Sequence, residues 1–154
     1  VIGYFSRFNH AEPQIMISCR GNCGSVNKTS GPAWINGNAM VVNIERNKHF
    51  VDFDFLYYLL SVTDFSPVVT GTGQPQIVRG PLAELPLSIP EQKEEQTAIA
   101  RVLLDMDAEI VALEGRLAKI DALKQAMMEA LLTGRVRLPI QSNAAPPTRE
   151  VEHA

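Results

Sequence analysis

Few side chains in this sequence have the types and spacing that metal binding or catalysis requires. Cys19 and Cys23 lack a second ligand pair at matching spacing, so two ordinary thiols flanking a turn are a better interpretation than a metal site. The glycine-rich run 70–74 (TGTGQ) lacks the Lys-Ser/Thr pair and the following helix that a phosphate-binding loop needs. No Ser/His/Asp or Cys/His set stands in a plausible context. We therefore expect no metal, no cofactor and no catalytic activity in this chain.

Two polar loops carry most of the groups that could bind a ligand. The first follows a β-prone segment that ends at Cys19, and the second precedes Ile77. Arginine can form two hydrogen bonds with guanine, asparagine or glutamine can do so with adenine, and lysine or threonine can hold a phosphate. Loops are commonly polar for other reasons, but this set of groups favours DNA binding. The candidate DNA-binding residues are Arg20, Asn22, Asn27, Lys28, Thr29, Gln74, Gln76 and Arg79.

Side-chain geometry divides these candidates into two kinds. Arg20 and Gln76 can pair with base edges, whereas Lys28 offers a point charge that suits a phosphate. The alternative is that Arg20 and Gln76 hold the loops to their own backbone.

A long helix with a coiled-coil stripe is predicted from Pro90 to Thr133, closed by Gly134. From Ile99 onward, alternating steps of four and three generate ten positions, and Ile, Leu or Met occupies nine of them; Lys124 is the exception. Such a helix would be about 65 Å long, too long to bury on a small domain, so we expect a partner helix. The alternative is a core helix of a compact bundle. The predicted contact residues, called the seam below, are Leu103, Met106, Ile110, Leu113, Leu117, Ile120 and Met127.

Charge and composition set further bounds. The net charge of the 154 residues is −3, which argues against general polyanion binding, and the acidic excess lies after residue 90. A surface for nucleic acid would therefore have to be local. The sequence has no apolar run of eighteen residues and nothing that resembles a signal peptide. We expect no membrane span and a cytoplasmic location.

The expected fold class is α+β, with a small mixed domain over 1–89, the long helix over 90–134 and a flexible tail over 135–154. The opening residues VIGYFSRF look like the middle of a domain, so the first domain is expected to be truncated at its N-terminus. Glycines 21, 24 and 31 would permit positive φ angles in the first loop. The expected elements are strands at Gln14–Cys19 and Ala39–Ile44, a helix at Asp54–Val62 with Leu56, Leu59 and Leu60 facing inward, and a strand near Leu85–Ile89.

Several runs resemble the specificity (S) subunit of type I restriction–modification systems. The run 89–93 (IPEQK) opens the long helix and 123–138 (LKQAMMEALLTGRVRL) closes it. The runs 17–26 (ISCRGNCGSV), 34–38 (WINGN) and 73–77 (GQPQI) are similar to the turn-and-strand signatures of its target-recognition domain, in the same order. The resemblance covers roughly residues 1–138.

This resemblance implies a target-recognition domain that reads one half of a split double-stranded DNA target, followed by a spacer helix. It also implies binding to modification subunits, which bring S-adenosylmethionine and the adenine methyltransferase site, and through them to restriction subunits. The S subunit itself catalyses nothing. Full-length subunits have two such domains and two antiparallel helices. This chain therefore looks like a half-subunit or a fragment, whose second helix would come from the same protein or from another copy.

Two alternatives remain at this stage. The chain could be the recognition module of a fused restriction–methyltransferase whose catalytic part lies upstream. It could also be a coiled-coil dimerisation piece whose truncated domain does not fold.

Overall fold

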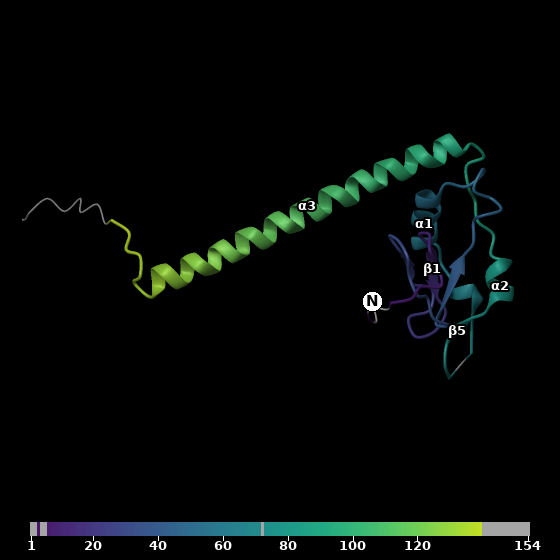
Figure 1. Ribbon diagram of the computed structural model, residues 1–154, viewed down its shortest axis with the longest axis horizontal. Helices are drawn as coiled ribbons and strands as arrows, with labels where there is room; N and C mark the ends of the chain where they lie inside the picture. The colour runs from purple at the N-terminus through teal and green to yellow at the C-terminus, as the bar shows by residue number, and fades with distance from the viewer. Residues whose placement is uncertain (1–2, 4–5, 72, 140–154) are drawn as a thin grey trace, which may run out of the picture. The chain divides into compact units, whose positions relative to one another are not determined.

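The computed structural model describes residues 3, 6–71 and 73–139, and its fold class is α+β, as predicted. Its contacts divide the chain into two units, Val1–Asp107 and Ala108–Ala154. The first unit contains every strand, the short helices and the beginning of the long helix (Figure 1). Thr72, most of the opening segment and the predicted tail from residue 140 onward lie outside the described residues.

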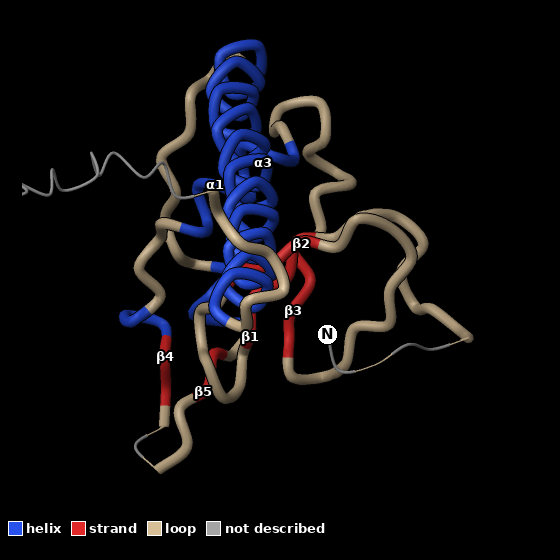
Figure 2. Tube along the Cα trace, turned by 90° about the vertical axis from the view of Figure 1, so that its left-hand side faces the viewer, coloured by secondary structure: helices blue, strands red, loops and turns tan. Residues whose placement is uncertain are grey.

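A three-stranded antiparallel sheet forms the centre of the first unit. β1 (Ile15–Ser18) pairs with β2 (Val26–Lys28) on one side and with β3 (Ala39–Val42) on the other. Figure 2 draws the strands in red. Side chains alternate across a strand, so Ile15 and Ile17 point to the same face, where both are buried. The predicted strand at Gln14–Cys19 is thus present as β1.

Helix α1 (Phe53–Ser61) covers the core at this face. The Asp52 carboxylate caps it by accepting a hydrogen bond from the Phe55 N–H. Phe55, Leu56 and Leu60 are buried and Leu59 is half-buried, so the predicted burial is confirmed for Leu56 and Leu60 and is partial for Leu59. The buried core consists of Ile15, Ile17, Cys19, Leu56, Leu60, Phe65, Val68 and Ile77.

A second, two-stranded sheet follows α1. The 3-10 helix η1 (Ser66–Val68) leads into β4 (Val69–Thr70), which pairs antiparallel with β5 (Gln76–Ile77), and α2 (Arg79–Ala83) comes next. The predicted strand at Leu85–Ile89 is absent, and that prediction was wrong. Pro86 lies inside this segment and Pro90 follows it; because proline has no N–H to donate, both disfavour a paired strand.

The long helix α3 spans Lys93–Leu132. It begins three residues after the predicted start, and the Pro90 carbonyl before it accepts a hydrogen bond from the side-chain amide of Gln96. Its C-terminal end follows the prediction, since Gly134 has a φ of 72° and its N–H donates to the Leu131 carbonyl.

The first turns of α3 are fastened to the segment that precedes α1. The Lys93 ammonium donates to the Lys48 carbonyl at 2.6 Å, and the Thr97 hydroxyl donates to the Asp52 carboxylate at 3.1 Å. One turn further, Ala100 is buried. These contacts explain why the compact unit extends to Asp107, well beyond the expected domain boundary at residue 89.

The seam of α3 is exposed along most of its length. Leu103 is half-buried, and each of the other six residues has more than half of its surface exposed, with values from 51% to 59%. Within the described residues, only Gln96 and Ala100 of α3 are buried. The arrangement therefore differs from that of a core helix in a compact bundle, and a partner helix remains a prediction.

Lys124 provides a first test of the seam. It lies in the apolar groove that Ile120, Leu123 and Met127 line, so Lys124→Leu should raise the melting temperature of the paired helix and loosen its choice of partner. Circular dichroism melts of this variant and of Lys119→Leu, on another face of the exposed helix, measure the difference. An unchanged or lowered melting temperature for Lys124→Leu would argue against a seam position.

Candidate nucleic-acid interface

The two polar loops meet where the sheet of β1 joins the hairpin of β4 and β5. The Ile77 N–H donates to the Cys19 carbonyl at 3.0 Å, and Arg20 and Gln76 form an antiparallel bridge. The Cys23 thiol contacts the Pro75 carbonyl at 3.2 Å. We call Cys19–Cys23 together with Pro75–Ile77 the loop junction. It brings residues from two distant parts of the sequence into one site.

The first loop is shaped by two glycines. Gly21 and Gly24 have φ angles of 74° and 83°, as predicted, whereas Gly31 has no positive φ. A Cβ atom on Gly24 would lie 3.0 Å from the Phe65 Cβ, so the turn also packs closely on the core. The Gly24 N–H donates to the Ser18 carbonyl at 2.9 Å, which closes the turn. The loop is thus held by its backbone and leaves its polar side chains free for other contacts.

Four candidate residues gather at or beside the loop junction. Arg20, Asn22 and Gln74 are exposed, and Gln76 is half-buried. None of the four side chains forms a hydrogen bond or ion pair with any residue that the structure describes. Arg79 follows at the first position of α2 and is also exposed. This group can offer guanidinium and amide groups to a ligand.

The other three candidates lie elsewhere, on β2 and just after it. Lys28 pairs with Ile15, which lies at the opposite end of β1 from Arg20. The stretch from Ile15 to Arg20 corresponds to about 17 Å along a strand. The Thr29 hydroxyl accepts a hydrogen bond from the Gln14 N–H at 2.9 Å and so extends the pairing of β1 and β2. The Asn27 amide reaches the Ser25 hydroxyl at 3.5 Å. The sequence suggested one set of residues, but the structure separates it into two places.

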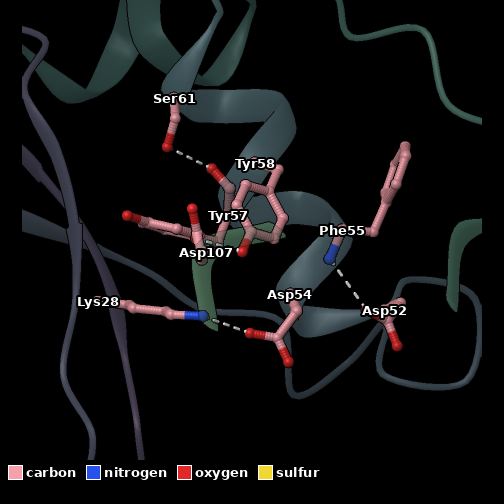
Figure 3. Close-up of polar contacts among 8 residues, drawn as sticks. All are labelled: Lys28, Asp52, Asp54, Phe55, Tyr57, Tyr58, Ser61 and Asp107. Carbon is pink, nitrogen blue, oxygen red and sulfur yellow. Dashed lines mark hydrogen bonds and ion pairs between the residues drawn. The ribbon is translucent and has the colours of Figure 1, made fainter. Parts of the chain in front are cut away.

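Lys28 is engaged by α1 (Figure 3). Its ammonium lies 2.6 Å from the Asp54 carboxylate and 4.6 Å from the centre of the Tyr57 ring. Both partners are only partly buried, so the ion pair contributes little to stability, on the order of 1 kcal/mol or less. A phosphate would have to compete with Asp54 for this lysine.

The neighbouring Tyr58 connects α1 to α3. Its hydroxyl donates to the Asp107 carboxylate at 2.6 Å. Desolvation, together with this carboxylate, raises the pKa of the Tyr58 phenol well above its ordinary value. The hydroxyl therefore remains protonated and continues to donate over the whole physiological pH range.

Gln96 is the structurally decisive residue that sequence reasoning missed. It is fully buried; its amide oxygen accepts from the Asp52 N–H at 2.9 Å, and its amide nitrogen donates to the carbonyls of Phe50 and Pro90 at 3.0 and 2.8 Å. Two of these partners lie more than forty residues away in the sequence, so the local pattern contains no signal for them. Gln96 fixes the start of α3 to the first unit.

Three further observations bear on features considered in the sequence. Across residues 3, 6–71 and 73–139, no three His, Cys, Asp or Glu side chains are placed to hold a metal ion. Within the same residues, no helix is both long and apolar enough to span a membrane. Cys19 and Cys23 are free thiols.

Comparison with known proteins identifies the family of the chain. The family model described as "Type I restriction modification DNA specificity domain" matches residues 1–124. The chain belongs to this family. No curated protein matches the chain.

Among solved structures, the specificity-domain chain is similar to the S subunit of a type I restriction–modification system from M. genitalium, with a TM-score of 0.65 and 22% sequence identity. The match covers 84% of this chain and 35% of that chain. The chain thus spans about a third of the length of that subunit, and the likeness establishes a shared fold.

Proposed function

We propose that this chain is a non-catalytic DNA-recognition unit that directs a type I restriction–modification complex to one half of a split DNA target. In this proposal, residues 1–89 form the target-recognition domain and 90–134 the spacer helix. Family membership supports a role in DNA specificity. The gathering of Arg20, Asn22, Gln74 and Gln76 at the loop junction is the observation that carries the proposal.

The loop junction has the properties that base reading needs. Its backbone is fixed by hydrogen bonds and by the buried residues Cys19 and Ile77, while its polar side chains remain accessible. Residues on loops held by a rigid sheet can enter the major groove and meet the donors and acceptors of the bases. Arg79 adds a positive charge beside them that can contact a phosphate.

The proposed partners follow from the family and from the exposed seam. They are double-stranded DNA, the modification subunits and, through them, the restriction subunits, with the cytoplasm as the proposed location. The seam is proposed to pair with a second spacer helix, supplied by the same protein or by a second copy. A chain that serves only as a coiled-coil dimerisation piece is the second candidate, and the exposed seam is the observation that favours it.

Selection from a pool of random DNA duplexes tests the proposed function. The 154-residue chain should enrich one short continuous motif, and its affinity should fall as salt rises because phosphate contacts release counterions. A folded chain that dimerises but enriches no motif would contradict DNA recognition and support the dimerisation role.

Lys28 should act on phosphate without reading sequence. Lys28→Ala is expected to weaken binding to all duplexes alike and to lower the slope of affinity against salt by about one unit. Fluorescence anisotropy at several salt concentrations measures both effects.

Asp54→Asn provides a matched control for this prediction. It removes the same ion pair as Lys28→Ala but leaves the lysine free for DNA. It should therefore keep or increase DNA affinity. If the two variants lose affinity equally, the ion pair is structural and Lys28 is no phosphate contact.

A further inference from the structure

We propose that Arg20 and Gln76 act as one unit and read two neighbouring base pairs, a G·C and an A·T, through the major groove. The inference rests on the proposed function and deepens it by specifying the class of DNA step that the loop junction recognises. Its basis is the antiparallel bridge between these two residues.

The bridge sets the distance between the two side chains. The flanking hydrogen bond runs from the Ile77 N–H to the Cys19 carbonyl, so Arg20 and Gln76 themselves form a pair of the type without direct hydrogen bonds. In such pairs the Cα atoms lie about 4.5 Å apart and both side chains leave the same face. Successive bases on one strand rise by about 3.4 Å. Two side chains at this spacing therefore suit two adjacent base pairs better than two base pairs that are separated along the DNA.

Both side chains are available, and their backbone is held in place. Cys19 and Ile77, the neighbours of Arg20 and Gln76, are only 7% and 3% exposed and belong to the core. Neither Arg20 nor Gln76 forms a side-chain hydrogen bond or ion pair with the part of the chain that the structure describes. This speaks against the alternative that they hold the loops to their own backbone. A supported backbone with unused donors is suited to binding a ligand.

The chemistry of the two side chains assigns the bases. The guanidinium of Arg20 can donate twice to guanine O6 and N7, and the amide of Gln76 can donate to adenine N7 and accept from adenine N6. Each correct pairing should favour its base by roughly 5- to 150-fold, equivalent to about 1–3 kcal/mol. The selected motif should therefore contain an adjacent guanine and adenine.

The test of Arg20 and Gln76 is a change in the preferred bases of the selected motif, rather than a loss of DNA binding. The full chain and the variants Arg20→Gln, Gln76→Glu and Gln125→Ala are each used to select from the random duplex pool, with melting curves recorded for all four. Arg20→Gln should change the preferred guanine to adenine, and Gln76→Glu should change the adjacent adenine to cytosine, because glutamate accepts from cytosine N4. Gln125→Ala, at an exposed position of α3 outside the loop junction, should leave both positions unchanged.

The outcomes separate this inference from the proposed function. If the wild-type chain folds but enriches no motif, DNA recognition fails and the inference fails with it. If the wild-type chain enriches a motif but folded variants keep its preferences, or change positions that are not adjacent, only the pairing of Arg20 with Gln76 is overturned. If one variant does not fold, the other still tests the pairing of Arg20 with Gln76. Folded Arg20→Gln should prefer adenine next to the adenine that Gln76 reads, and folded Gln76→Glu should prefer cytosine next to the guanine that Arg20 reads.

Discussion

Replacement of Leu113 and Leu117 by aspartate should abolish the association of α3 with a second helix. Both leucines are exposed in this chain, at 55% and 59%, and both belong to the seam. Fully burying a leucine contributes about 1.5–3 kcal/mol, and the double variant removes two such residues and places two charges in the interface. Sedimentation velocity of the wild type and the variant, alone and with a spacer helix supplied in trans, measures the effect.

A matched control places the same charges on another face of the same helix. Val111 and Ala118 are exposed and lie away from the seam, so Val111→Asp with Ala118→Asp should leave association intact. Equal loss in both double variants would indicate damage to the helix itself. A wild-type chain that remains monomeric and also binds no second spacer helix would contradict the seam altogether.

Gln96→Leu should lower the free energy of unfolding of the first unit by about 3 kcal/mol. The substitution keeps a side chain of similar size but leaves the Asp52 N–H and the carbonyls of Phe50 and Pro90 without their partner. A buried polar group left unpaired costs about 1–3 kcal/mol. These three groups are partly buried, so each should cost about 1 kcal/mol, near the lower end of that range. Urea unfolding followed by circular dichroism gives the difference.

Gln125→Leu is the control for this variant, because Gln125 lies on the same helix and is exposed. It should change the free energy of unfolding by less than about 0.5 kcal/mol. A loss for Gln96→Leu no larger than that of the control would mean that the three hydrogen bonds do not hold α3 to the first unit.

Local periodicity accounts for the parts of the fold that could be predicted. The β-prone segment Gln14–Cys19 identified β1, and the 3.5-residue repeat with Gly134 identified most of α3. These patterns depend only on neighbours in the chain, so one sequence is enough to recognise them. The failure at Leu85–Ile89 has the same origin, since apolar residues suggested a strand while the prolines around them removed the necessary donors.

Contacts between distant segments account for what could not be predicted. The sequence supplied the candidate DNA-binding residues, but nothing in it showed that Arg20 would lie opposite Gln76 or that Lys28 would lie at the other end of β1. The ion pair of Lys28 with Asp54 and the three bonds of Gln96 also depend on tertiary packing. Such pairings are decided by how the strands and helices meet, which residue types alone do not specify.

The alternation at the loop junction has an evolutionary consequence. Cys19 and Ile77 are buried, while Arg20 is exposed and Gln76 is half-buried, so residues that hold the fold alternate with residues that face outward. Substitutions at surface positions usually change stability by less than about 0.5 kcal/mol. Mutation can therefore sample new side chains at Arg20 and Gln76 at little cost to folding, so a lineage could acquire a different target while keeping the same scaffold.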